Sequence, residues 1–375
     1  MGMRLAGRQG PAPDDVSTQP VTRTLTGHSR GGRAGRGDLA RAVPLPCAPG
    51  ADSLLARIET LAVTGGAVAE PLTKADVDRM AKELSNWGRW GPEDERGTLN
   101  LITDEARAAA LRLIRDSAVV SCALPLPVTP APGNFRPVEH HVLRAGDAAS
   151  REGLSFSADY FAIAPHGMAT THLDALCHVF SNGRMYNGFD QAEVRSDGAR
   201  RNSIMAGKDG IVGRGVLLDL PGLQGVDWLE PGAPIHLEDL LAAEERQGVR
   251  VQPGDIVLIG TGRDARRAAH GPWDFRDAGL AGLYADCLPW LFDRGVAVLG
   301  CDGVSDVLPS RVEGSVQPIH EVAIAHIGIH IIDNMALDRL TAACRERNRY
   351  AFAFFLAPLR LERGTASPLN PLAVF

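Results

Sequence analysis

The sequence is poor in cysteine and has no long hydrophobic run. Its six cysteines lie far apart without a CxxC pair, and a chain of 375 residues does not need disulfides to hold its fold. No stretch approaches the roughly 18 consecutive apolar residues of a membrane span, and no apolar segment follows the first charges as in a secretory signal. We therefore expect free thiols, no membrane contact and a cytoplasmic location.

An excess of basic residues is also missing. The chain has 39 Lys and Arg against 45 Asp and Glu, which gives a formal charge of -6. This mildly acidic balance argues against nucleic acid as a partner. Hydrophobic residues make up 45% of the chain, which is enough for a large core.

The composition changes near residue 70. Residues 1–70 are rich in Gly, Pro, Ser and Arg and are predicted to form a disordered basic tail. A targeting peptide is one alternative, although amphipathic periodicity is lacking, and a start codon placed too far upstream of Met80 is another. Residues 71–375 are predicted to form one folded domain, because no long linker interrupts them.

Hydrophobic periodicity predicts a mixed α/β domain without internal repeats. A capping box at Thr73 predicts a helix that ends near Ser85, and a second helix is expected over residues 104–116. Apolar, β-branched runs predict strands at 118–124, 155–163, 215–220, 256–260, 297–301, 328–332 and 350–356. Further helical patterns cover residues 237–247, 281–294 and 336–346.

Three histidines and an aspartate lie within one short stretch, residues 165–178. His172 and Asp174 are two residues apart, so they project to the same side of an extended segment, and together they are a fair start for a Zn²⁺ or Mn²⁺ site. His178 has the residue type of a general acid or base near neutral pH. The spacing alone is equally consistent with histidines that have a structural, hydrogen-bonded role.

A second cluster of histidines and aspartates lies late in the chain and includes His320 and Asp333. A rigid metal site takes ligands from more than one segment, and a histidine and an aspartate from this cluster would complete a set of four with His172 and Asp174. Asp333 ends an apolar strand, where an acidic side chain is hard to explain structurally. His326 and His330 are weaker candidates, since surface or packing roles explain them as well.

The glycines at Gly260 and Gly262 follow a predicted strand, as in a dinucleotide-binding turn. Such a site requires a helix to open directly after the glycines, whereas here the helix-breaking sequence at residues 270–274 follows. An ordinary turn is therefore favoured, and nicotinamide-dependent chemistry is the weaker alternative.

Four separated segments, in the same order, share a pattern with a known family; they are residues 85–100, 171–178, 183–188 and 328–340. Together they resemble the cyclase family of metal-dependent hydrolases, which includes bacterial kynurenine formamidase and isatin hydrolase. The resemblance extends from about Ser85 to the C-terminus. It implies a swivelling β/β/α fold with a barrel-like mixed sheet, surrounding helices, a homodimeric or homotetrameric assembly and a small-molecule substrate.

The resemblance also implies a divalent metal ion, Zn or Mn, that activates water against an amide or related carbonyl. The family motif HxGTHxDxPxH takes its first two histidines and its aspartate as ligands and its last histidine as the acid or base. His172, Asp174 and His178 match this motif, but Met168 stands in place of the first histidine, and a thioether is a poor ligand for a hard ion. Either His166 replaces it, or only a site formed by Asp174 with His320 and Asp333 remains, and we favour the second.

The resemblance predicts a substrate-binding wall and an activity. Trp87 and Trp90 would face a planar substrate, and Tyr186 and Asn187 would add polar contacts, although core anchoring and a plain turn explain these residues equally well. We expect amide hydrolysis similar to that of kynurenine formamidase, with His178 as the acid or base. The alternatives are hydrolysis of a cyclic lactam or lactone, and a metal-free binding protein that has lost catalysis.

Overall fold

The computed structural model describes residues 71–375. The predicted tail at residues 1–70, with its two alternatives, lies outside the described residues. Within the described part, no helix is both long and apolar enough to cross a membrane.

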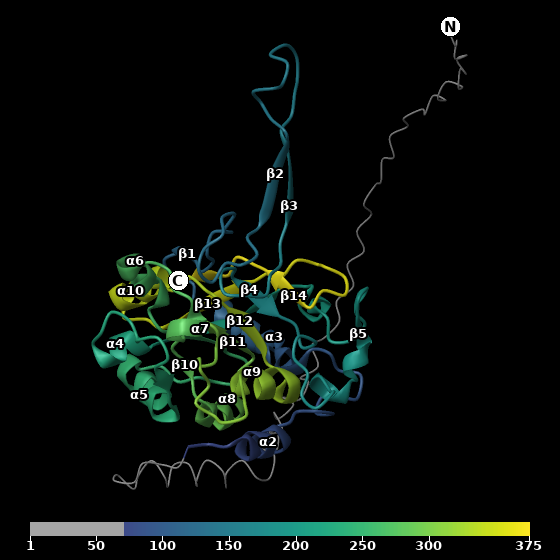
Figure 1. The fold of residues 1–375 in the computed structure, drawn as a ribbon. Coiled ribbons are helices and arrows are strands. Elements are labelled where there is room, and N and C mark those ends of the chain that lie inside the picture. Colours follow the sequence, from purple (N-terminus) through teal and green to yellow (C-terminus); the bar gives the residue numbers. More distant parts are fainter. Residues whose placement is uncertain (1–70) are drawn as a thin grey trace, which may run out of the picture. The chain divides into compact units, whose positions relative to one another are not determined.

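Nine strands form one mixed sheet, as the predicted fold class requires (Figure 1). The four central strands are parallel to one another, and the outer strands pair antiparallel. In spatial order they are β1 (Val119–Ser121), β15 (Leu372–Val374), β13 (Ala351–Leu356), β7 (Ile211–Asp219), β9 (Ile256–Gly260), β11 (Val298–Cys301), β12 (His330–Asp333), β4 (His172–Asp174) and β14 (Ala366–Pro368).

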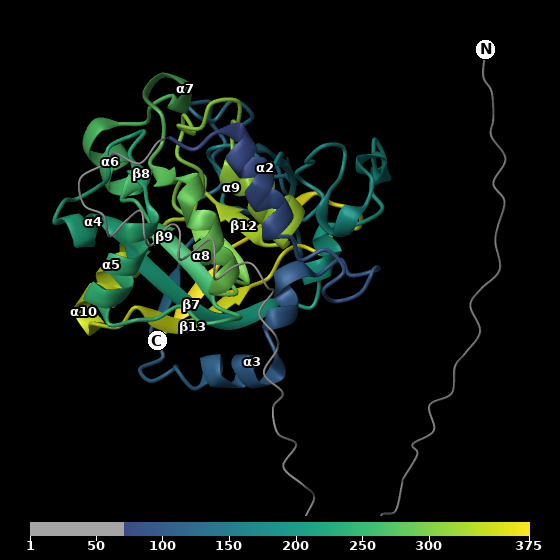
Figure 2. The same ribbon diagram turned by 90° about the horizontal axis from the view of Figure 1, so that it is seen from below.

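Helices cover both faces of this sheet, and the strands between them are buried on both sides. In Figure 2, α3 lies on one side of β7 and β13, while α5 and α8 lie on the other. Burial on both sides explains why β9 has a continuous run of apolar residues instead of alternating apolar and polar residues. The helices are α2 (Lys74–Glu83), α3 (Asp104–Leu111), α4 (Leu220–Gln224), α5 (Leu237–Gln247), α6 (Arg263–His270), α7 (Phe275–Ala278), α8 (Leu288–Asp293), α9 (Pro318–Val322) and α10 (Asp338–Arg347).

Local sequence signals predict most of these elements, but the structure corrects two of the predictions. The capping box at Thr73 is present, and α2 begins at the next residue, as predicted. The prediction of one helix over residues 281–294 is wrong in its first half. There β10 (Gly282–Leu283) pairs with β8 (Pro234–Ile235), and α8 begins only at Leu288, with a proline in its first turn where no backbone donor is needed.

The glycine turn after β9 gives the second correction. A helix does open there, since α6 begins at Arg263, directly after Gly262. The backbone amides of Thr261, Gly262 and Arg263 donate hydrogen bonds of 2.9–3.2 Å to the carboxylate of Asp302. In dinucleotide-binding turns, such amides donate hydrogen bonds to a phosphate. Here the carboxylate of Asp302 accepts these hydrogen bonds instead.

Besides β8 and β10, two further pairs of strands stand apart from the main sheet. β2 (Glu139–Arg144) and β3 (Ala158–Ala162) form an antiparallel ribbon that projects away from the sheet in Figure 1. The second pair is β5 (Val194–Arg195) with β6 (Gly198–Ala199). The strand expected at residues 155–163 is thus confirmed as β3, but its partner β2 was not predicted.

Candidate metal centre

Strands β4 and β12 lie side by side and bring together the two clusters that the sequence places far apart. His172 pairs with Asp333 across these antiparallel strands. Because side chains alternate along a strand, Asp174 lies on the same face as His172. All three side chains are buried, so this edge of the sheet holds one imidazole and two carboxylates away from water.

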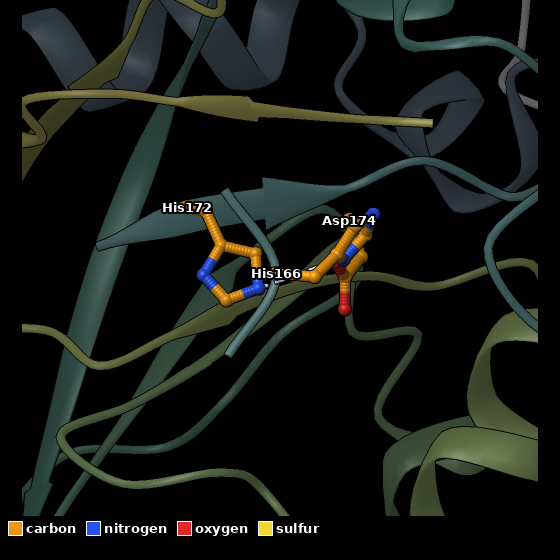
Figure 3. Close-up of side chains that lie close together, drawn as sticks. All are labelled: His166, His172 and Asp174. Carbon is orange, nitrogen blue, oxygen red and sulfur yellow. Dashed lines mark ion pairs between the residues drawn. The ribbon is translucent and has the colours of Figure 1, made fainter. Parts of the chain in front are cut away.

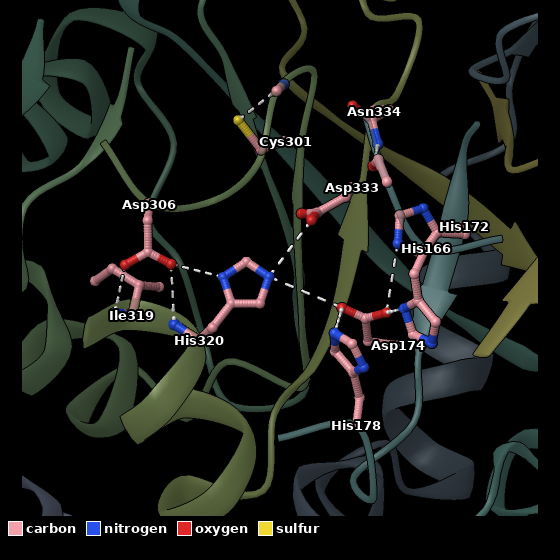
Figure 4. A network of polar contacts seen from close by, with 12 residues as sticks. His166, His172, Asp174, His178, Cys301, Asp306, Ile319, His320, Asp333 and Asn334 are labelled. Carbon is pink, nitrogen blue, oxygen red and sulfur yellow. Dashed lines mark hydrogen bonds and ion pairs between the residues drawn. The ribbon is translucent and has the colours of Figure 1, made fainter. Parts of the chain in front are cut away.

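The deeper part of the centre consists of Asp174, His320 and Asp333 (Figure 4), and we call it the inner triad. The Nε2 atom of His320 lies 3.4 Å from Oδ2 of Asp333 and 3.8 Å from Oδ2 of Asp174. The other ring nitrogen, Nδ1, lies 2.6 Å from a carboxylate oxygen of Asp306. Asp306 also accepts the amides of Ile319 and His320, so it fixes both the ring and the start of α9.

The shallower part consists of His166, His172 and Asp174 (Figure 3), and we call it the outer triad. Oδ1 of Asp174 lies 3.0 Å from Nδ1 of His166 and 3.4 Å from Nε2 of His172. The second nitrogen of each ring has an oxygen partner, the Thr365 hydroxyl at 3.1 Å and the Thr170 carbonyl at 2.8 Å, respectively. The two triads therefore share Asp174, with a different oxygen of its carboxylate facing each.

The three histidines of the two triads are arranged in the same way. Each has one ring nitrogen next to an oxygen atom of the protein and the other directed toward Asp174. This is the usual arrangement of metal-binding histidines, in which an outer oxygen fixes the ring and leaves the other nitrogen lone pair free.

Within residues 71–375, several buried polar atoms of the centre lie near ion-pair partners but have no partner with hydrogen-bond geometry. They are both carboxylate oxygens of Asp174, Oδ1 of Asp333 and Nδ1 of His166. A buried carboxylate is costly unless a positive charge compensates it. Imidazole nitrogens and carboxylate oxygens are also ligands that Zn²⁺ and Mn²⁺ accept. The residues of both triads thus fit a divalent cation.

Electrostatics agree with this interpretation. Burial disfavours the charged form of His172, but Asp174 outweighs it and raises the pKa of His172 to about 9. Burial also opposes charge on His320, yet Asp333 and Asp306 raise its pKa well above the ordinary value. Burial works against the Asp174 carboxylate as well, but His172 and His166 hold its pKa well below the usual range. The carboxylates therefore create a negative field that, without a bound cation, keeps protons on His172 and His320.

His178 lies beside both triads and is half-buried. Its Nε2 atom is 3.9 Å from Oδ2 of Asp174, and its ring stacks on that of His166 with centroids 3.8 Å apart. Burial, together with the neighbouring histidines, lowers the pKa of His178 to about 4. The ring is therefore neutral at physiological pH and can accept a proton.

A buried clamp, which sequence reasoning missed, holds the loop that carries His166. Arg263 donates to the carbonyl of Met168 at 2.8 Å and to the side-chain oxygen of Asn334 at 2.7 Å. The Asn334 amide in turn donates to the carbonyls of Gly167 and Thr170, at 2.7 and 3.3 Å. Met168 thus contributes its backbone carbonyl to the clamp. A signal for Asn334 existed, since asparagine favours the positive φ of 56° found there, but Arg263 had none.

The residues predicted to bind substrate form contacts within the protein. Tyr186 is fully buried and donates to Asp94 at 2.9 Å, and the Asn187 side-chain amide donates to three carbonyls of residues 91–94. Trp87 donates to the Ala325 carbonyl at 2.8 Å, and its ring stacks on that of His326, while the residue as a whole is 37% exposed. The half-buried Trp90 packs under the Arg89 guanidinium. A role in substrate binding stays a prediction for all four, because these contacts already explain their positions.

Comparison with known proteins identifies the family. The Cyclase family model matches residues 104–306. The chain belongs to the cyclase family. A solved structure described as a novel cyclase is 30% identical, covers 79% of this chain and 99% of its own, and superposes with a TM-score of 0.71.

A second solved structure, isatin hydrolase A from Ralstonia solanacearum, is 24% identical to this cyclase-family chain. The match covers 72% of this chain and 97% of that one, with a TM-score of 0.51, and it supports the fold alone. No curated protein matched the chain.

Proposed function

We propose that this cyclase-family protein is a metal-dependent hydrolase that cleaves an amide-type C–N bond, in the manner of a kynurenine formamidase. The observation that carries the proposal is the pair of triads around Asp174, whose buried carboxylate oxygens have no hydrogen-bond partner within the described residues. Without a bound cation, the carboxylates of the centre would have to be balanced by protonation of the buried His172 and His320 rings. A metal-free binding protein would have no need for three anchored histidines around one carboxylate.

The metal would be held by His172, Asp174, His320 and Asp333, with His166 as a further ligand from the loop. A divalent cation bound there supplies Lewis acidity, which lowers the pKa of a water molecule and polarises a carbonyl group. Thr170, Thr365 and Asp306 keep the imidazole rings aimed inward through the nitrogens that face away from Asp174. The protein thereby prearranges the ligand atoms before the substrate arrives.

His178 would move the proton in this reaction. Its neutral ring can accept a proton from the attacking water, and the imidazolium that forms beside Asp174 is stabilised by that carboxylate. The same ring then donates the proton to the leaving nitrogen. Its half-exposed position suits this role, because a substrate must reach it from solvent while Asp174 stays buried.

A cyclic lactam is the second candidate substrate, because one of the structural neighbours is named an isatin hydrolase. Opening a lactam ring requires the same attack on an amide carbonyl and the same proton transfer to nitrogen. The two candidates differ in whether the leaving amine stays tethered to the acyl group.

Metal analysis and a substrate panel test the proposal. Protein purified without chelator or affinity tag should contain Zn or Mn, and His172→Ala should lose most of it. The loaded protein should hydrolyse N-formylkynurenine, isatin or a lactone, and His178→Ala should lose turnover while keeping its metal. Absence of bound metal after incubation with Zn²⁺ or Mn²⁺ would overturn the proposal in favour of a metal-free binding protein.

A further inference from the structure

Arg263, the buried residue of the clamp, carries a positive charge that the hydrogen bonds of the clamp do not balance. Its guanidinium donates to the Met168 carbonyl, the Asp302 carbonyl and the side-chain oxygen of Asn334, which are all neutral acceptors. The residue is 9% exposed, and within residues 71–375 its Nε atom has no hydrogen-bond partner. A buried cation is costly unless a negative group compensates it, so this guanidinium favours a further, negative partner.

The two carboxylates that act on this guanidinium are bound to other groups. Asp302 accepts the backbone amides at the start of α6 and the hydroxyl of Thr261. The carboxylate of Asp264 lies 3.9 Å from the guanidinium of Arg267. Burial, together with the like charge of Arg267, lowers the pKa of Arg263. The charge of Arg263 is therefore only partly compensated.

A second guanidinium belongs to the same pocket. Arg266 follows Arg263 by three residues on α6, so the two side chains are neighbours on one face of the helix, and both line a small pocket there. The Nε atom of Arg266 is also buried and without a hydrogen-bond partner in the described part of the chain. The other walls are mainly apolar and consist of Leu229, Pro231, Trp273, Leu280 and Ala281. Two guanidinium N–H groups without an acceptor thus belong to residues that line one pocket with apolar walls.

One carboxylate approaches Arg266 from the solvent. Oε2 of Glu230 lies 3.7 Å from Nε of Arg266, which is too far for a hydrogen bond. Its other oxygen accepts from the indole nitrogen of Trp228 at 3.0 Å, and the side chain is 75% exposed. Solvent screens such a pair, so Glu230 compensates the charge of the pocket only weakly.

We propose that this pocket binds one small monovalent anion, a halide such as chloride. The anion would accept the Nε–H groups of Arg263 and Arg266 and compensate the buried charge. A phosphate or carboxylate group fits less well, because each of its oxygen atoms needs donors that apolar walls do not supply. None of the residues that line the pocket belongs to either triad, so this site is separate from the metal centre.

The linewidth of the chloride NMR signal tests the proposal on the full chain. At constant ionic strength, the wild type should broaden the signal through a saturable site. Arg266→Gln removes one of the two charges and should weaken chloride binding at least about 10-fold. The matched control is Arg267→Gln, because this neighbouring arginine of α6 does not line the pocket, and it should keep the affinity within about 2-fold.

A change at Glu230 separates a bound halide from the carboxylate of the protein itself. Glu230→Gln removes the negative charge 3.7 Å from the Nε atom of Arg266, so chloride should bind about 2- to 5-fold more tightly. Weaker binding would mean that Glu230 helps to form the site instead of competing with the anion, and it would contradict the proposal.

Crystals soaked in bromide locate the anion. An anomalous map at the bromine absorption edge should show a peak in the pocket for the wild type and none there for Arg266→Gln. The proposal is wrong if the wild type shows no saturable broadening, if Arg266→Gln binds chloride as tightly as the wild type, or if bromide peaks occur only elsewhere. Far-ultraviolet circular dichroism checks that each variant has folded. None of these results depends on the metal chemistry.

Discussion

The inner and outer triads share one carboxylate but are built differently. The inner triad takes all of its side chains from strands and a helix, and all three are buried. The outer triad includes His166, which is half-buried and lies on a loop held by Asn334 and Arg263. Regular elements fix the side chains of the inner triad, while the position of His166 depends on hydrogen bonds to its loop. Under the proposed function, the affinity for a metal would therefore be divided between a rigid and a loop-dependent part of one site.

The largest expected effect comes from the residue that the two triads share. Asp174→Asn removes the negative charge from both triads, so bound metal should fall to near zero and turnover by at least about 1,000-fold. Elemental analysis and steady-state kinetics measure the two effects. The exposed Asp197→Asn is the control and should leave both unchanged. Full metal content in Asp174→Asn would show that the triads do not share a ligand.

Removing one histidine from each triad should separate them. His320→Ala should weaken metal binding by about 100-fold or more, and His166→Ala by only about 10-fold, because the loop ligand is partly exposed and water can replace it. Competition with a chromogenic chelator gives both affinities. Equal losses, or a larger loss for His166→Ala, would contradict the division into a rigid inner and a loop-dependent outer part.

Substitution of a residue that holds a metal-binding side chain in place should affect only the triad to which that side chain belongs. Asn334→Ala and Asp306→Asn are each expected to weaken metal binding about 10-fold, since such outer contacts typically contribute 10–100-fold. In double variants, His166→Ala should add little to Asn334→Ala, because both disable the same loop, but it should add fully to Asp306→Asn. Additivity in both pairs would mean that Asn334 does not act through His166.

The smallest expected effect concerns His330, a third buried histidine, which shares strand β12 with Asp333. His320 has carboxylate partners, whereas both ring nitrogens of His330 have none within the described chain. Burial lowers the pKa of His330 from 6.5 to about 4. Protonation therefore favours the unfolded state, and stability should fall as pH drops from 6.5 toward 4.

The size of this change is on the order of 2 kcal/mol between pH 8 and pH 5. Urea unfolding of metal-free protein at the two pH values, for the wild type and for His330→Leu, measures it. The variant should lose this part of the pH dependence. An unchanged pH dependence would mean that His330 is not buried in its neutral form.

Local spacing was enough to predict part of the site. His172 and Asp174 are two residues apart, and any extended segment places them on one face. The family resemblance supplied His320 and Asp333, and β4 and β12 indeed lie next to each other. His166 was predicted only as a possible replacement for Met168, yet its ring lies within the outer triad.

The clamp and the ribbon could not be predicted in the same way. Arg263 contacts Met168 and Asn334, which lie 95 and 71 residues away, and no local pattern encodes such contacts. Helix α6 was not predicted because the helix-breaking residues that begin at His270 leave little room for a helix after Gly262. Eight residues nevertheless suffice for two turns. β2 lacks the run of buried apolar residues that marks a strand, because all of its side chains are exposed.

The most direct test of the metal centre is an anomalous diffraction map from crystals soaked in Zn²⁺ or Mn²⁺, recorded at the absorption edge of the metal. The account predicts a peak about 2.0–2.2 Å from a carboxylate oxygen of Asp174 and from a ring nitrogen of His172 or His320. A map with no peak among these residues, or with its peaks only elsewhere on the protein, would contradict the assignment.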